Sequence, residues 1–170
     1  MEDELRYQIE VTLATNGSND HKSGIRQAVE TALRRHKVRG ATINILIVDD
    51  LEMARLHKTH LGQEGPTDVL AFDLGDAPVH AHGKIEKARA STRVIEGEVV
   101  VSLDTARREA SQRRHPVEAE LALYAVHGTL HLLGYKDETE ADAHRMHVEE
   151  DEILVEVGFA PTYNKSPKCE

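Results

Sequence analysis

The sequence predicts an α+β fold with a mixed four-stranded sheet and about five helices. Short runs rich in β-branched residues alternate with longer segments whose apolar residues recur every three to four positions. One run, residues 41–48, is apolar almost throughout, which is typical of a strand buried on both faces. The 170 residues suffice for one core and not for two, so we expect a single domain over residues 1–170.

The first half of the chain is expected to contain three strands and two helices. Residues 7–13 alternate with a period of two, which favours a strand. The next segment is predicted to be an amphipathic helix, marked by Ile25, Ala28, Val29, Ala32 and Leu33. After the buried strand, we expect a helix over residues 50–60, capped by Asp49 or Asp50, and a third strand over residues 68–74.

The second half is expected to contain one strand and three helices. Residues 99–103 have the composition of a strand, and a helix should follow it to about Arg114. Pro116 suits the first turn of the next helix, and Gly134 suits its end, because glycine readily adopts the left-handed conformation of a helix C-cap. A last helix is predicted over residues 139–157.

Two segments lack a clear period. Residues 75–95 contain turn formers and charges, which predicts a mobile loop. His80 and His82 lie in it, and histidines in such a loop are more often solvent-exposed than bound to a metal. The tail after about residue 161 is expected to be frayed.

A metal site is predicted in the helix before Gly134. His127 and His131 are four residues apart, so both imidazoles project from nearly the same side of a helix and can share one ion. The turn at Gly134 then offers Asp137 as a third ligand. Because the chain has 11 histidines, the pair alone could arise by chance, but the glycine and the carboxylate make the pattern more specific.

The spacing resembles the zincin signature His-Glu-x-x-His-x-x-Gly-x-x-His, which predicts a zincin-like metal helix. Gly128 replaces the glutamate that is the general base of metalloproteases, and this argues against peptide hydrolysis. Asp137 replaces the last histidine and adds a negative charge. His144 or His147 could be the third ligand instead, if the following helix covers the site. The ligand set suits zinc, but also iron, nickel or manganese.

Three blocks of sequence together resemble the YbeY family of metal-dependent endoribonucleases. The first is His-Gly-Thr-Leu-His-Leu-Leu-Gly-Tyr, residues 127–135, which an acidic helix follows. The second is Pro-Thr-Asp-Val-Leu-Ala-Phe, residues 66–72, and the third is Gly-Glu-Val-Val-Val-Ser, residues 97–102. The resemblance covers roughly residues 41–157 and implies a zinc enzyme, with one ion per chain, that cuts single-stranded RNA. It also implies a role in ribosomal RNA maturation and ribosome quality control, with the small ribosomal subunit and its assembly factors as partners.

The second block supplies candidate catalytic residues. Asp68 could act as general base or as a hydrogen-bond acceptor behind the metal, and Thr67 could donate to phosphate. The alternative is a simple turn before a strand, and Glu98 has a similar but weaker claim. Leu61 stands where the family usually has an arginine, which puts the strength of nuclease activity in doubt. The neighbouring His57, Lys58 and His60 could take over part of that role.

Composition limits the possible functions. The net charge of −9 argues against generic nucleic-acid binding, since phosphate contacts depend on lysine and arginine. The acids concentrate at residues 138–156, and the bases cluster at residues 34–39, 84–93 and 107–114. Each basic cluster is more often a solvated face than an RNA groove. No apolar segment approaches membrane-spanning length, and the single cysteine, Cys169, has no intrachain partner, so we expect a cytoplasmic protein without membrane or DNA partners.

Two further hypotheses follow from the positions at which the sequence differs from the YbeY and zincin patterns. The chain could be a ribosome-associated RNA-binding module with a structural metal and weak or absent nuclease activity, which Leu61 and Asp137 favour. It could also be a hydrolase of the zincin type, against which Gly128 argues.

Overall fold

The computed structural model describes residues 6–17, 19–75 and 94–163. Its elements are, in chain order, β1 (Arg6–Leu13), a short 3-10 helix (Asn19–His21), α1 (Lys22–Arg35), β2 (Gly40–Val48), α2 (Asp50–Leu61), β3 (Val69–Asp73), β4 (Val94–Ser102), α3 (Leu103–Arg113), α4 (Val117–Leu132) and α5 (Glu140–Glu156). The predicted α+β class, with a four-stranded sheet and five α-helices, is confirmed.

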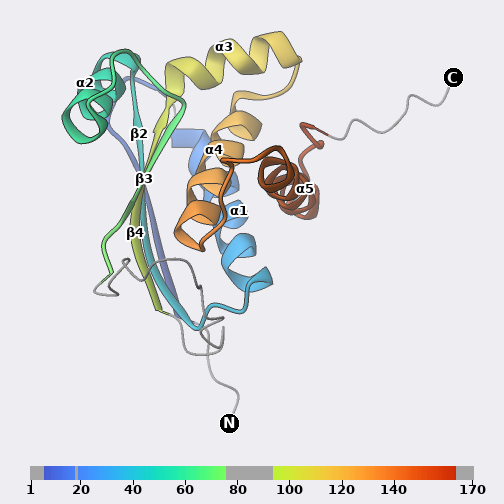
Figure 1. Ribbon diagram of the computed structural model, residues 1–170. Helices are drawn as coiled ribbons and strands as arrows, with labels where there is room; N and C mark the ends of the chain where they lie inside the picture. Colours follow the sequence, from blue (N-terminus) through green and yellow to red (C-terminus); the bar gives the residue numbers. More distant parts are fainter. Residues whose placement is uncertain (1–5, 18, 76–93, 164–170) are drawn as a thin grey trace, which may run out of the picture.

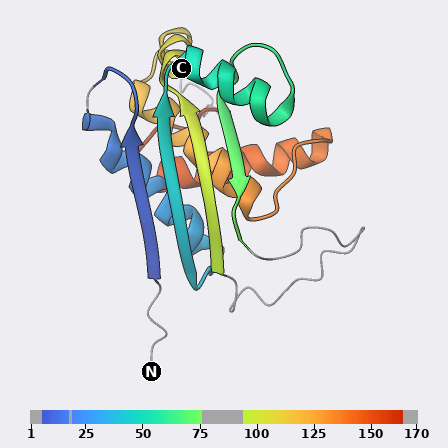
Figure 2. The ribbon, with the colours of Figure 1, turned by 90° about the vertical axis from the view of Figure 1, so that its left-hand side faces the viewer.

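The sheet is mixed, with strand order β1-β2-β4-β3. β1, β2 and β4 are parallel, and β3 runs antiparallel to β4 at one edge (Figure 2). β2 therefore has a strand on each side, which agrees with the nearly continuous apolar run that predicted a buried strand. The helix α1 connects the parallel strands β1 and β2, as a crossover between parallel neighbours requires.

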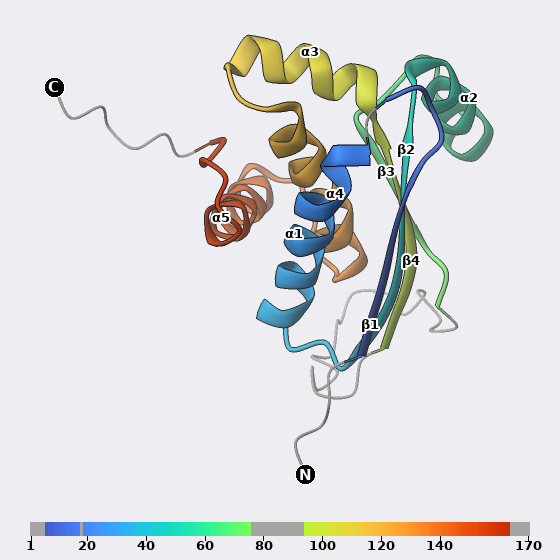
Figure 3. The same ribbon diagram turned by 180° about the vertical axis from the view of Figure 1, so that it is seen from behind.

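The helices cover the two faces of the sheet unequally. Figure 1 shows α1 and α4 on one face, with α5 packed outside α4, and α2 on the opposite face at one end. Seen from behind, α1 lies over β1 and beside α4 (Figure 3). The main core fills the space between the sheet and α1, α4 and α5, and a smaller core of Val48, Met53, Leu70 and Val100 lies under α2. The helix α4, which carries His127 and His131, thus lies between the sheet and α5.

The helix α4 is buried on nearly every side. Its positions from Ala119 to Leu132 are buried except His127 and His131, which are half-buried. Tyr124 is also buried. Gly128 lies directly against the sheet: a Cβ at this position would come within 2.5 Å of Cγ1 of Val99. Close packing of α4 on β4 therefore requires a residue without a side chain here.

Several boundaries differ from those predicted. β4 begins at Val94, five positions before the expected start, because residues 94–98 continue the pairing with β2. Glu96 and Glu98 gave this half of the strand the composition of a loop. Pro116 is the N-cap of α4 in extended conformation and so stands just before the first turn. The rest of the predicted loop, with His80 and His82, lies outside the described residues, as does the tail beyond Tyr163.

Candidate metal centre

The turn after α4 brings Asp137 back over the two histidines. The Gly134 amide donates to the carbonyl of His131 and the Tyr135 amide to that of Leu130, both at 3.0 Å. This pair of bonds is a Schellman motif, and Gly134 takes the positive φ of 99° that the motif requires. The predicted glycine stop is confirmed.

Three predicted residues converge on one point. The Nε2 atoms of His127 and His131 are 3.0 Å apart, and Oδ2 of Asp137 lies 3.7 Å and 3.6 Å from them. Ligands held about 2.0–2.1 Å from a tetrahedral ion are separated by roughly 3.3 Å, so the triangle fits one ion with small adjustments. Among the described residues, neither His144 nor His147 belongs to this group. The structure therefore favours Asp137 as the third ligand.

The second nitrogen of each imidazole is held by an acceptor. Nδ1 of His127 donates to Oε1 of Glu150 at 2.6 Å, and Nδ1 of His131 donates to the carbonyl oxygen of Tyr135 at 3.0 Å. Because both protons are committed to these bonds, both Nε2 atoms of the neutral rings carry lone pairs that point at one another and at a carboxylate. Three converging acceptors repel one another unless they share a cation. These three ligand atoms therefore fit a bound metal ion. Each histidine also makes, through its Nδ1, the hydrogen bond that metal-bound histidines usually make.

Glu150 also shapes the electrostatics of the pair. Burial acts to lower the pKa of His127, but the hydrogen bond that its ring donates to Glu150 and the charges of Glu150, Asp68 and Asp137 outweigh this, and the pKa is raised. The side chain of Glu150 is fully buried. The surroundings of His127 therefore favour a positive charge at this ring. Sequence reasoning missed Glu150, because nothing local distinguishes it from the other acids of the same helix.

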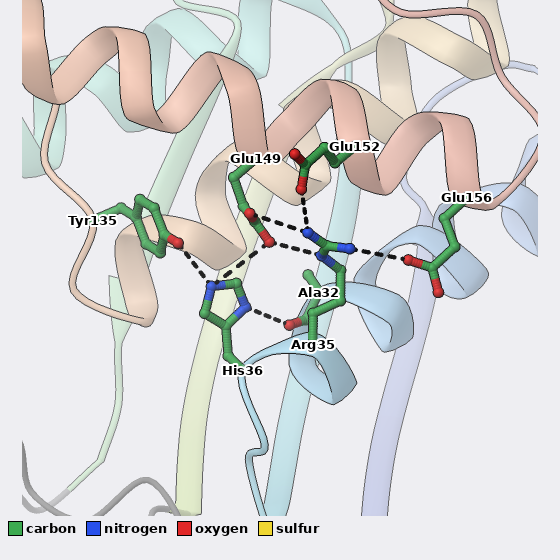
Figure 4. Close-up of polar contacts among 7 residues, drawn as sticks. All are labelled: Ala32, Arg35, His36, Tyr135, Glu149, Glu152 and Glu156. Carbon is green, nitrogen blue, oxygen red and sulfur yellow. Dashed lines mark hydrogen bonds and ion pairs between the residues drawn. The ribbon is translucent and has the colours of Figure 1, made fainter.

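An ion-pair cluster fixes α5, the helix that carries Glu150, against α1. Figure 4 shows Arg35 at its centre. Its guanidinium contacts three carboxylates on one face of α5, those of Glu149, Glu152 and Glu156. The contact with Glu149 is 2.8 Å. The acids that gave this segment its negative charge are thus partly neutralised by a residue of α1.

The same region anchors the turn that holds His131. Nδ1 of His36 donates to the carbonyl of Ala32, so Nε2 of the neutral ring accepts from the hydroxyl of Tyr135, both at 2.8 Å (Figure 4). The carbonyl of Tyr135 is the acceptor for His131. The end of α1 therefore supports both histidines indirectly, one through the turn and one through α5.

A cavity of about 450 Å³ opens beside the metal centre. It is lined by residues from four separate segments, among them Thr67, Asp68, Arg113, Tyr124, His127 and Tyr163. Both predicted catalytic residues thus reach the same space as His127. Oδ1 of Asp68 also accepts from the Val69 amide at 2.8 Å and from the Thr67 hydroxyl at 3.3 Å, so the turn before β3 is formed as well.

The other residues considered for catalysis lie elsewhere. Glu98 precedes Val99, which contacts α4, and alternation along the strand puts Glu98 on the opposite face of the sheet. His57 is held by the carbonyl of Gly65, and His60 packs on Phe72. Neither they nor Lys58, which pairs with Glu64, line the cavity.

Many of the arginines that formed the predicted basic clusters are engaged within the fold. The pairs, besides those of Arg35, are Arg34 with Glu30, Arg107 with Asp104, Arg108 with Asp50, and Arg113 with Glu120 and Glu109. This favours the interpretation of the clusters at residues 34–39 and 107–114 as structural faces. The cluster at residues 84–93 lies outside the described residues.

The fold and site define a class of protein: an α+β structure that presents two histidines and a carboxylate, beside an open cavity, is typical of hydrolases that use a single metal ion. The comparisons then identify the family. The model of the family "Endoribonuclease YbeY" matches residues 8–158, and this chain belongs to that family.

Individual relatives agree with this assignment. A Moorella thermoacetica protein named endoribonuclease YbeY is 36% identical over 142 residues, which are 81% of this chain and 86% of that protein. The Bacillus subtilis protein of the same name is 32% identical, over 70% of this chain and 74% of its own length. A Myxococcus xanthus protein, also so named, is 39% identical over 71% of this chain, but the match spans only 38% of that longer protein.

A solved structure shows the same fold. The solution structure of TM1509 from Thermotoga maritima superposes with a TM-score of 0.56, covering 96% of this chain and all of that one. At 21% identity, the likeness concerns the fold alone. Over the described residues, no helix combines the length and apolar character needed to cross a membrane.

Proposed function

We propose that this protein is a zinc-dependent endoribonuclease that cuts single-stranded RNA and acts in ribosomal RNA maturation and ribosome quality control. The observation that carries the proposal is the convergence of His127, His131 and Asp137, each histidine oriented through its Nδ1, at the edge of the cavity. Membership in a family whose relatives are named endoribonucleases supports RNA as the substrate.

The proposed roles follow from the positions of the side chains. His127, His131 and Asp137 would hold the zinc ion, which supplies a Lewis acid and lowers the pKa of water when it is bound. Asp68 is the candidate general base. The hydrogen bonds of its turn are made to Oδ1, so Oδ2 is the atom that would accept a proton. The Thr67 hydroxyl makes only a long bond of 3.3 Å and can turn to a phosphate oxygen.

The position of Gly128 separates this proposal from peptide hydrolysis. The residue that supplies the general base of zincin peptidases would stand here, yet a Cβ at this site would press on Val99 of the sheet. A glutamate at position 128 therefore does not fit this helix packing. The proton acceptor has to come from another element, and Asp68 lies at the cavity that His127 lines.

The cellular part of the proposal rests on the family resemblance. By this resemblance, the partners are ribosomal RNA, the small ribosomal subunit and its assembly factors, and the location is the cytoplasm. A second function, an RNA-binding module with a structural metal and weak or absent cutting, is favoured by one observation: Leu61, at the family's arginine position, is 55% exposed and brings no cation to the site.

The experiment compares zinc-loaded wild type with Asp68→Asn on a single-stranded RNA, the matching duplex and a DNA of the same sequence. We expect cutting of the single-stranded RNA only, and a fall in kcat of about 100-fold or more in the variant with its zinc content unchanged. Glu98→Gln, a carboxylate of β4 on the opposite face, is the matched control and should cut normally. Zinc-loaded wild type that binds RNA without cutting it would favour the binding-module function.

A further inference from the structure

The residues that line the cavity beside His127 suit a nucleobase better than a phosphate. Its one guanidinium, Arg113, is already paired with Glu120 at 2.9 Å and with Glu109 at 3.4 Å. Asp68 and Glu109 add two carboxylates to the lining. A phosphate beside Arg113 would therefore meet more negative than positive charge, whereas a neutral base can donate its N–H groups to Glu109.

Aromatic rings complete the walls. Tyr124 and Tyr163 line the cavity, and Tyr163 is held from two sides. Its ring is stacked on His147, with centroids 3.8 Å apart and 12° between the planes, and Tyr163 is 40% exposed. Its backbone amide donates to Asp151, as does that of Thr162. Such a fixed ring is a suitable platform for a splayed-out base of single-stranded RNA.

The polar groups also indicate which base fits. Glu109 and Arg113 are four residues apart on α3 and present an acceptor and a donor side by side. Guanine matches this pair, because its N1–H and N2–H₂ donate to a carboxylate while its O6 accepts from a guanidinium. Uracil offers one donor between two acceptors and matches it less well.

We propose that this cavity is a guanine subsite that holds the base next to the phosphate bound at the metal centre. The proposal rests on the proposed ribonuclease function for its biological meaning. Tyr163 stacks on the base, and Glu109 with Arg113 reads its edge. The cavity volume of about 450 Å³ lies in the range of small-molecule sites.

The first test measures cleavage. Zinc-loaded protein is given single-stranded RNAs that differ in one base on either side of a fixed cut. We expect guanine to be preferred on one side and Tyr163→Ala to raise KM for that substrate about 5- to 150-fold. Tyr163→Phe, which keeps the stacking face, should reverse most of this rise in KM. Glu109→Gln should abolish the preference for guanine over uracil while zinc content stays at the wild-type value. Equal cutting of all four bases, or a Tyr163→Ala variant with wild-type KM, would overturn the subsite.

The second test does not depend on cutting. Binding of guanosine, which carries no phosphate, is followed by NMR in wild type and in Tyr163→Ala. We expect shifts in the Tyr163 and His147 rings, weaker binding of uridine, and loss of guanosine binding in the variant. Guanosine binding without cleavage of any RNA would contradict the ribonuclease function and retain the subsite. Cleavage without guanosine binding, or occupation of the cavity by inorganic phosphate in its place, would retain the function and overturn the subsite.

Discussion

Glu150 provides the sharpest test of how the metal centre is built. Its carboxylate is fully buried, and it accepts from Nδ1 of His127 at 2.6 Å, a short distance typical of a charge-assisted bond. If this bond orients the ring and raises its basicity, removing the carboxylate should weaken metal binding, although Glu150 does not touch the ion. The change is Glu150→Ala, with Glu150→Gln as the conservative variant.

The magnitude follows from the bond. Hydrogen bonds to charged groups contribute about 1.5–3 kcal/mol, and every 1.4 kcal/mol is tenfold in a dissociation constant. We therefore expect the zinc Kd of Glu150→Ala to rise about 10- to 100-fold, as for other acceptors behind metal-bound histidines. Glu150→Gln keeps an oxygen that can accept from Nδ1 and loses only the charge, so its Kd should rise less.

The assay is a competition titration of zinc against a chromophoric chelator, at fixed pH. Glu140→Gln is the matched control, because it removes the same charge from an exposed position of the same helix outside the Arg35 cluster, and its Kd should stay within about twofold. A wild-type Kd in a folded Glu150→Ala protein would refute the argument that this bond prepares His127 for metal binding. The ¹⁵N shifts of the His127 ring report independently whether the tautomer changes.

Three other changes test separate parts of the structure. Asp137→Ala should raise the zinc Kd at least tenfold while Asp137→His retains binding; equal Kd values in the chelator titration would exclude Asp137 as ligand. Gly128→Ala places a methyl 2.5 Å from Val99 and should lower the free energy of unfolding by about 1–3 kcal/mol, measured with urea; unchanged stability would show that α4 can move. Arg108 lowers the pKa of Asp50, so this carboxylate stabilises the fold above its unfolded pKa of about 4, and the stabilisation is lost as the pH falls through the lower folded value. Asp50→Asn should accordingly be less stable than wild type at neutral pH and equal to it in acid; a difference that persists at pH 2 would contradict this.

The parts that could be predicted from sequence depend on local chemistry. The spacing of His127 and His131 fixes their common side on a helix, and glycine at position 134 specifies the turn that returns Asp137. The strands were recognisable wherever apolar residues faced a core. The first half of β4 was missed because Glu96 and Glu98 lie on the face opposite α4, where charges are tolerated.

The parts that could not be predicted depend on contacts between distant segments. Glu150 lies 23 positions after His127 and becomes its partner only because α5 packs on α4. Arg113 and Tyr163 meet at the cavity from the end of α3 and from the segment after α5. Neither residue has a local pattern that distinguishes it, since both roles arise from tertiary packing.

The central claim, a single metal ion that makes this chain a ribonuclease, is tested most directly by one comparison. Zinc content and cleavage of a single-stranded RNA are measured on purified wild type and on His131→Ala under zinc-loaded conditions. We expect one ion per chain and RNA cutting in the wild type, and loss of both in the variant. Cutting that persists in a zinc-free His131→Ala protein, or a wild type that binds no zinc, would contradict it.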